Sequence, residues 1–200
     1  MWNIRTILSC VGLLLSTILI KGVLASEKCA TLESAGPGKL VEYLQGERST
    51  LTDSCISFAI ERLGQQRFSP ASSTLVNYLD FKLPQPPPPS DRPIRVGPIR
   101  TVVSVYPAAG ALFQIGLPSS PFLAGAIGNP DSSDLIRHNA LETLQIIHSG
   151  NITEAVSVLV RAGRGLKDHL ASQRMLDAAR EIAVHCPEPQ RNSCMNALSQ

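Results

Sequence analysis

The sequence predicts an all-α protein built as a short right-handed solenoid of antiparallel helix pairs, with a proline-rich insertion. Stretches with apolar residues at helical spacing follow one another along the chain, and each is bounded by Ser, Asn, Asp, Gly or Pro. The β-branched run at residues 99–105 could form a strand, but no second comparable run exists to pair with it. A pattern of small and bulky residues also recurs in several helical stretches, which indicates repeated units.

Length and charge limit the class of protein. The chain has 200 residues, of which 44% are hydrophobic, so it is long enough to bury a core. It has 18 Lys and Arg against 16 Asp and Glu, but Arg5 and Lys21 lie in a segment that we expect to be removed. Without these two residues, the chain has equal numbers of basic and acidic side chains. Because a neutral chain lacks the basic excess that drives non-specific nucleic-acid binding, we expect no nucleic-acid partner.

Residues 1–25 are typical of a secretory signal peptide. Arg5 precedes an apolar run at residues 7–20, and Ala25 places a small residue before the expected cleavage point. A membrane anchor is the alternative, but Lys21 interrupts the apolar run. We therefore expect a secreted or periplasmic protein that does not bind the membrane after cleavage.

The cysteines fit an exported protein. Cys10 lies in the signal peptide, so cleavage leaves Cys29, Cys55, Cys186 and Cys194, an even number in an oxidising compartment. Four cysteines permit three pairings. Pairing Cys29 with Cys55 and Cys186 with Cys194 would join each end of the chain to its neighbouring helix. This pairing is favoured over the two crossed ones, which stay open.

After the signal peptide we expect an N-terminal segment with a short helix at residues 26–48 and a helical domain at residues 49–186. The inward face of the first helix of that domain is formed by Ile56, Ala59, Ile60 and Leu63. Gly64 is expected to end this helix. Pro70 lies near the start of the next helix, where its missing N–H is tolerated, and the two helices should form an antiparallel pair.

A proline-rich insertion is predicted at residues 82–105. Six prolines lie between Pro84 and Pro93, and because proline fixes φ and lacks an N–H, residues 84–89 should be extended polyproline II. Residues 99–105 should be extended or lead into the next helix. The P-x-x-P frames are typical of ligands for aromatic grooves, but such modules are mostly intracellular, so a spacer or connecting loop is favoured.

Helical spacing resumes after the insertion. Pro107 and Pro121 each lie near a first turn, and amphipathic helices follow at residues 133–150, 151–165 and 167–186. The inward faces of the first and last of these three helices are expected to be formed by Leu135, Ala140, Leu141, Leu144, Ile146 and Ile147, and by Leu170, Met175, Leu176, Ala179, Ile182 and Ala183. Residues 187–200 are predicted as a C-terminal tail.

A local pattern recurs at residues 59–64, 111–116 and 140–144. In each copy an Ala is followed four residues later by Leu or Ile, one turn along the same face, and the first two copies end in Gly. Small residues let a neighbouring helix approach closely. Stacked helix pairs can then share a continuous core that a single pair cannot form alone.

This pattern resembles that of the HEAT-like family of helical repeats, whose units are two antiparallel helices with an Ala-x-x-x-Leu-Gly core. The resemblance extends over residues 51–186 and implies a solenoid whose groove binds proteins or peptides. The copies are 52 and 29 residues apart, against about 40–47 in the family. The insertion explains why the first spacing is longer than in the family. A short second helix at residues 121–127 explains why the second spacing is shorter. An irregular helical bundle is the alternative.

The sequence lacks the common catalytic signatures. It contains no G-x-S-x-G, H-E-x-x-H, Walker-type or G-x-G-x-x-G motif, so we expect a protein that is not an enzyme and uses no cofactor. An exported hydrolase or lyase with a site assembled only in three dimensions is the alternative, with His138, His148 or His169 as its base. His138 and Glu142 share a helix face at i,i+4 spacing, which is more typical of a solvated surface.

A metal site is less favoured than a disulfide at the C-terminal end. His185, Cys186 and Cys194 could supply ligands, but structural zinc sites usually combine two closely spaced ligand pairs. We therefore expect no metal.

Together these observations predict an exported interaction scaffold with a protein or peptide partner. Candidate contact residues lie at one turn and in the insertion, namely Gln65, Gln66, Arg67, Arg92, Arg95 and Arg100. The basic residues of the last two helices alternate with acidic ones, which indicates a mixed soluble surface rather than an anion-binding patch. A purely structural part in a larger envelope assembly is a third alternative.

Overall fold

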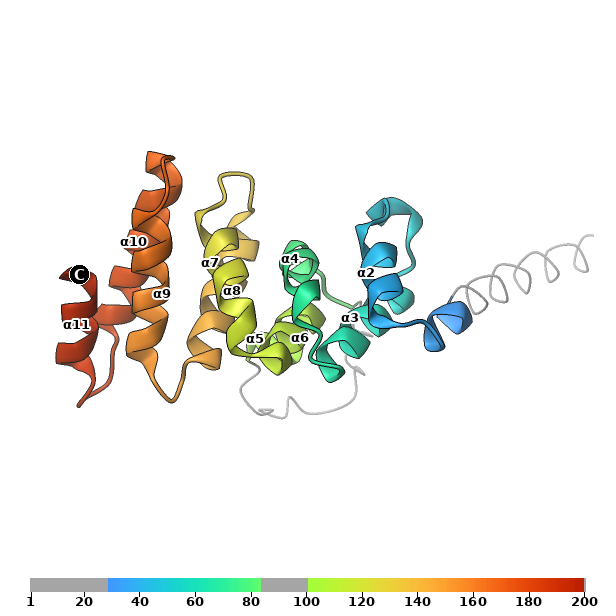
Figure 1. The fold of residues 1–200 in the computed structure, drawn as a ribbon, viewed down its shortest axis with the longest axis horizontal. Coiled ribbons are helices and arrows are strands. Elements are labelled where there is room, and N and C mark those ends of the chain that lie inside the picture. Colours follow the sequence, from blue (N-terminus) through green and yellow to red (C-terminus); the bar gives the residue numbers. More distant parts are fainter. Residues whose placement is uncertain (1–28, 84–100, 200) are drawn as a thin grey trace, which may run out of the picture. The chain divides into compact units, whose positions relative to one another are not determined.

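The structure, a computed structural model, describes residues 29–83 and 101–199 (Figure 1). Every regular element in these two ranges is a helix, and neither contains a strand. The all-α prediction is therefore confirmed for the described part of the chain. Contacts divide the chain into two compact units, Met1–Ala59 and Ile60–Gln200. The predicted signal peptide at residues 1–25 and most of the predicted insertion lie outside the described residues.

The first unit contains the short helix predicted within residues 26–48. A helical turn at residues 29–33 is followed by α2 (Pro37–Gln45), the 3-10 helix η1 (Arg48–Thr50) and the first part of α3 (Asp53–Gln65). Its buried apolar side chains are Leu32, Leu40, Leu44, Cys55, Ile56 and Ala59. A disulfide joins Cys29 to Cys55, whose Cα atoms are 5.3 Å apart. This agrees with the favoured pairing at the N-terminal end.

Gly64 does not end α3 as predicted. The helix continues to Gln65, and Arg67 takes the left-handed conformation beyond it, with φ of 49°. Gly64 instead lies against α6 (Pro107–Ile115), where a Cβ atom at Gly64 would be 2.6 Å from Ala111 Cα. The first two copies of the repeated pattern therefore meet at this close approach.

Short helical turns precede the predicted insertion, and another forms its last residues. After α3 come η2 (Ser69–Ala71), which has Pro70 in its first turn, α4 (Ser72–Leu75) and η3 (Val76–Tyr78). After residue 100 the chain forms α5 (Val102–Val105), where extended backbone or a helix approach was expected. Val102 is buried and α5 packs against α6, so tertiary packing overrides the β preference of valine. Regular helix thus extends into the predicted insertion.

Prolines mark the starts of the next helices as predicted, and a glycine ends the first of them. Pro107 lies in the first turn of α6, and Gly116 ends that helix with φ of 80°, a conformation that glycine adopts without strain. The 3-10 helix η4 (Leu117–Ser119) leads into α7 (Ser120–Gly128), which has Pro121 in its first turn.

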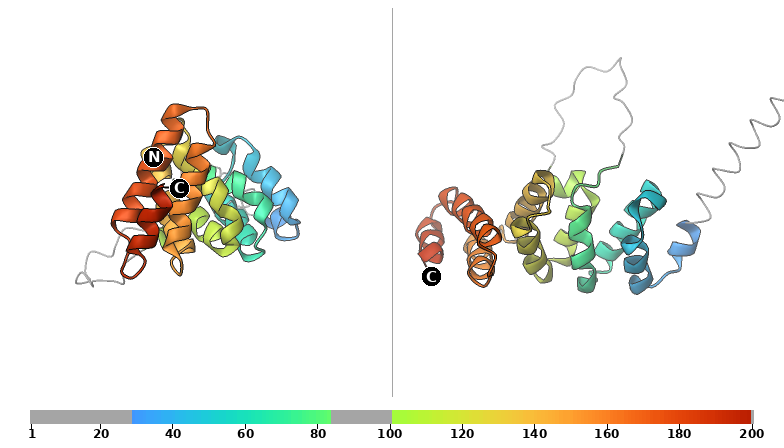
Figure 2. Two further views of the ribbon diagram at one scale, coloured as in Figure 1. Left: turned by 60° about the vertical axis from the view of Figure 1, so that its left-hand side comes forward. Right: turned by 90° about the horizontal axis from the view of Figure 1, so that it is seen from above.

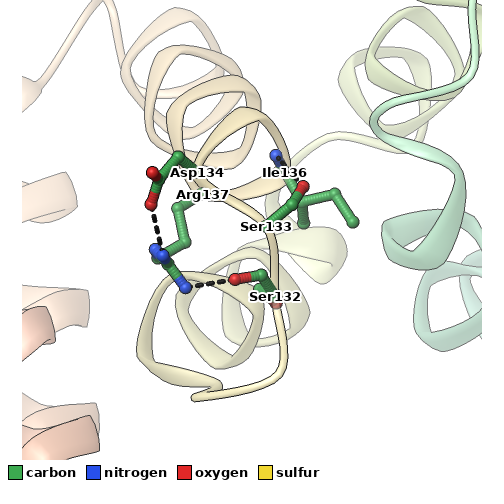
Figure 3. Close-up of polar contacts among 5 residues, drawn as sticks. All are labelled: Ser132, Ser133, Asp134, Ile136 and Arg137. Atoms are coloured by element: carbon green, nitrogen blue, oxygen red, sulfur yellow. Dashed lines mark hydrogen bonds and ion pairs between the residues drawn. The ribbon is translucent and has the colours of Figure 1, made fainter.

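The three predicted amphipathic helices are α8 (Asp134–Ile147), α9 (Ile152–Arg164) and α10 (His169–Val184). Ser133 Oγ accepts a hydrogen bond of 3.2 Å from the Ile136 N–H and so caps α8, while Arg137 contacts the Asp134 carboxylate and the Ser132 carbonyl (Figure 3). Asp168 caps α10 by accepting from the N–H groups of residues 170 and 171. These caps fix where α8 and α10 begin.

Helices α7 and α8 lie side by side, as do α9 and α10 (Figure 1). Residues 187–200 were predicted as a tail, but they contain α11 (Arg191–Ser199), which packs beside α9 and α10 (Figure 2). The reason is that α11 buries Cys194 and Ala197 and is fastened by a disulfide to Cys186, with 6.6 Å between the cysteine Cα atoms. This disulfide agrees with the favoured pairing at the C-terminal end.

The predicted inward faces are buried in the middle of α8 and α10, whereas the predicted members Ile146, Ile147 and Leu176 are only half-buried. Ala140 and Leu144 of α8 and Met175, Ala179 and Ile182 of α10 are buried. Leu135 and Leu170, in the first turns, are 42% and 52% exposed because the neighbouring helices do not cover those turns. A polar side chain joins the core: Asn139 is buried, and its Nδ2 donates a 2.7 Å hydrogen bond to the Leu79 carbonyl.

Within residues 29–83 and 101–199 no single helix is long and apolar enough to cross a membrane. The segments Pro107–Ile115 and Leu117–Gly128 pass the length and composition test only as a pair bent by 116°.

Candidate functional site

Two hollows that share Glu181 lie between α8 and α10. The first has a volume of about 340 Å³ and is lined by Arg137, His138 and Leu141 of α8 and by Arg174, Asp177 and Glu181 of α10. The second has a volume of about 400 Å³ and is lined by Gln145, Ile146 and Ser149 near the end of α8 and by Glu181, Ile182 and His185 near the end of α10. We call the two hollows together the α8–α10 groove.

The helical period explains why these side chains meet. On α8, His138, Leu141 and Gln145 follow one another at spacings of three and four residues, which places them on one face. On α10, Arg174 and Glu181 are seven residues apart, two turns along a face, with the small Ala178 between them. Side chains of these two faces line the groove, and Ile127 of α7 also lines the first hollow.

Most charged side chains in the first hollow have partners. Arg137 is paired with Asp134, and His138 Nε2 lies 3.2 Å from Glu142 Oε1. Asp177 Oδ1 accepts a 2.5 Å bond from Arg180 Nη1. All three pairs are partly exposed to solvent, so they orient the groove walls and contribute little to stability. The solvated face predicted for His138 and Glu142 is correct.

Arg174 differs from these residues. Its Nη1 atom is excluded from solvent and has no hydrogen-bond partner among the described residues. A buried nitrogen without an acceptor costs on the order of 1–3 kcal/mol. The side chain also lines the first hollow. The groove therefore contains a cation whose hydrogen-bonding capacity is incompletely used.

The closest arrangement to a catalytic pair is away from the groove. His148 Nε2 lies 2.9 Å from Ser120 Oγ, which joins the residue after α8 to the first residue of α7. Ser120 is 3% exposed and His148 is 5% exposed. A substrate cannot reach this pair in the observed conformation, so its evident role is to join two helices.

Burial of His148 makes the stability of the folded protein depend on pH. Burial lowers the pKa of His148 below its ordinary value of 6.5, and the charge of Glu154 opposes this effect. Because the unfolded chain then binds more protons than the folded one, stability should fall as the pH drops below 6.5 and should stop falling once it is below the folded pKa. Thermal unfolding from pH 7.5 to 5 should show a shallower decline for His148→Gln than for the wild type.

The control for this prediction is His169→Gln, since His169 is an exposed residue at the start of α10. It should retain the pH dependence of the wild type. Equal slopes for wild type and His148→Gln would contradict the assignment of the pH dependence to His148.

The remaining candidate bases, His138 and His169, are exposed. His138 lines the first hollow, but no Ser, Thr or Cys is among the described residues that line it. His185 lines the second hollow, and its Nδ1 lies 2.9 Å from the Glu181 carbonyl. No group of three or more His, Cys, Asp or Glu side chains that could hold a metal ion is found in the part of the chain that the structure describes.

The predicted contact residues that the structure describes are not among those that line the groove. Gln65, Gln66 and Arg67 are exposed at the end of α3, whereas Arg92, Arg95 and Arg100 lie outside the described residues. Sequence reasoning treated the charged residues of α8 and α10 as an ordinary solvated surface. Their shared helix faces were visible in the sequence, but it was not visible that α8 and α10 line the same hollows.

Comparisons of the chain with models of protein families, with curated proteins and with solved structures find no match.

Proposed function

We propose that the protein is an exported, non-catalytic scaffold that binds a protein or peptide partner in the α8–α10 groove. In this proposal α7 to α11 are part of a short solenoid of antiparallel helix pairs of the HEAT-like type, right-handed as the resemblance implies. The observation that carries the proposal is a groove with apolar and charged walls between two helices that are not neighbours in sequence.

The direction of the helices supports stacked pairs. Residues 137–141 of α8 line the first hollow with residues 174–181 of α10, and residues 145–149 line the second with residues 181–185, so the two helices follow the groove in the same order. The Ile152 N–H donates to Gln190 Oε1 at 3.2 Å, and Arg164 Nη2 donates to the Leu198 carbonyl at 3.3 Å. The starts of α9 and α11 are thus close together, and so are their ends. Helices α8 and α10 therefore run in the same direction, and so do α9 and α11, as alternate helices do in a solenoid.

Contacts between successive helices fit opposite directions. Ser120 at the start of α7 contacts His148 just after the end of α8. Gly163 near the end of α9 is close enough to the start of α10 that a Cβ there would lie 3.2 Å from the Ser172 carbonyl. These contacts support antiparallel pairs of α7 with α8 and of α9 with α10.

Export is supported by the disulfides and by the N-terminal sequence. Cys55, Cys186 and Cys194 are buried, and both disulfides join residues that would otherwise be free thiols. Disulfides persist in oxidising compartments and are rare in the cytosol of most organisms. Together with the signal-peptide pattern at residues 1–25, they favour a secreted or periplasmic protein.

Filling the groove tests the proposal. Peptides selected from a random displayed library on the mature, disulfide-intact protein should bind His138→Trp at least tenfold more weakly in fluorescence anisotropy, because the indole occupies the first hollow. His138 is largely exposed, so the substitution should leave the fold intact. The matched control is Gln66→Trp, at an exposed position outside the groove, which should bind normally.

Two results would contradict the groove assignment. If Gln66→Trp weakens binding and His138→Trp does not, the partner binds at the end of α3. If no peptide is selected, the binding function itself fails.

The Ser120 and His148 contact is the one observation that favours a hydrolase instead. Hydrolysis of ester or amide substrates by the mature protein, abolished in Ser120→Ala, would replace the scaffold proposal. Without such activity the pair is a structural contact.

A further inference from the structure

Resting on the proposed function, we infer that the α8–α10 groove takes a peptide in a polyproline II conformation that carries an acidic and a basic side chain three residues apart. The acidic side chain pairs with Arg174 and the basic one with Glu181. The inference goes beyond the scaffold function because it names the chemistry of the partner.

Arg174 supplies the first half of the recognition. Arg174 lines the first hollow, and its solvent-excluded Nη1 has no acceptor among the described residues. A carboxylate is the strongest acceptor that a peptide offers, and it matches the planar donors of a guanidinium. An acidic side chain in the hollow would therefore pair with the positive charge of Arg174.

Glu181 supplies the second half. It lines both hollows and is exposed. The other charges of the first hollow, Arg137, His138 and Asp177, already have ion-pair partners. No ion pair is found for Arg174 or Glu181 with any described residue, so these two are the charges most available to a ligand.

The spacing of Arg174 and Glu181 along α10 fits a peptide in a polyproline II conformation. Seven residues of α-helix advance about 10.5 Å. A polyproline II helix completes one turn in three residues and advances about 9.3 Å per turn, so side chains three residues apart point the same way. Their separation is close to the advance of α10 between Arg174 and Glu181. In a β-strand the residues three apart point to opposite faces, so an extended strand would present only one of the two charges.

The wall between the charges is apolar. Leu141 of α8 and Ala178 of α10 both line the first hollow, and Ala178 leaves room beside Arg174. The residues between the two charged positions of the peptide should therefore be apolar. A polyanion such as a nucleic acid fits poorly, since Asp177 and Glu181 line the same hollow.

The test uses the mature, disulfide-intact protein and a random eight-residue peptide library displayed on phage. Selected peptides should share opposite charges three residues apart, in one preferred order. A fluorescein-labelled peptide of that sequence should bind Arg174→Gln and Glu181→Gln at least tenfold more weakly than the wild type. Lys167→Gln, which removes an exposed charge outside the groove, should bind normally.

Exchange of the two charges gives the sharpest result. The double variant R174E/E181R should bind a peptide with its two charges exchanged better than it binds the original peptide. Circular dichroism and thermal unfolding of each variant show whether it is folded. Glu181 is exposed, so Glu181→Gln keeps the test open even if a variant of Arg174 fails to fold.

Other results separate this inference from the proposed function. If selected peptides lack the charge pair but lose affinity for His138→Trp, the inference is overturned and the groove function stands. If selected peptides bind His138→Trp and wild type equally, or if no peptide is selected, both are overturned. If affinity for a charged peptide is unchanged in Arg174→Gln and Glu181→Gln, the assignment of these two residues is wrong.

Discussion

Replacing Gly64 by alanine should lower the free energy of unfolding by about 2–3 kcal/mol, the upper part of the range for overpacked sites. The new Cβ would lie 2.6 Å from Ala111 Cα and 2.9 Å from Ala111 Cβ. Both atoms belong to the helix body of α6 and cannot rotate away, so α3 and α6 would have to separate. In a chain of this size the midpoint of thermal unfolding should fall by about 4–12 °C, measured by the far-ultraviolet circular dichroism signal.

Gly125→Ala is the matched control. Gly125 lies inside α7, and a Cβ there would meet nothing within 4 Å. Because alanine is the better helix former and restricts the unfolded chain, this variant should gain about 0.4–1 kcal/mol. If both variants are stabilised, the close approach at Gly64 is not a constraint on packing.

Removal of the disulfides should have the second large effect. Loop-closure entropy predicts a loss of about 3.6 kcal/mol for Cys29→Ser with Cys55→Ser, and of about 2.6 kcal/mol for Cys186→Ser with Cys194→Ser, since the first loop is longer. Denaturant unfolding of the two double variants under oxidising conditions measures both losses. The second variant should also show faster amide hydrogen exchange in α11, which that disulfide fastens to the end of α10.

A thiol titration provides the control for the disulfides. The mature protein should show no reactive thiol before reduction. Free thiols in the untreated protein, or double variants as stable as the wild type, would contradict the role of the two disulfides.

Helix positions follow well from local sequence. Pro107 and Pro121 lie in first turns, Gly116 ends α6, and Asp168 caps α10, all as the sequence predicts or permits. Each of these signals acts within one or two turns of its own helix, so no distant residue is needed to interpret it.

Residues whose roles depend on a distant neighbour were predicted less well. Gly64 looks like a helix end but is a contact with α6, and Leu135 and Leu170 follow the apolar period but are exposed. The helix in residues 187–200 was missed because its apolar content is low and its packing depends on Cys194. Helical period alone does not say where a face is covered.

The sequence by itself determined that the described chain is helical, where most helices begin and end, and which cysteine pairing is favoured. Only the tertiary structure decided that α8 and α10 line the same hollows, that Gly64 meets Ala111, and that Arg174 and Glu181 line one groove. The physical reason is that caps, prolines and apolar periods act on neighbouring residues, whereas small and apolar side chains fit many partners equally well. The choice among those partners depends on how the whole set of helices fills space.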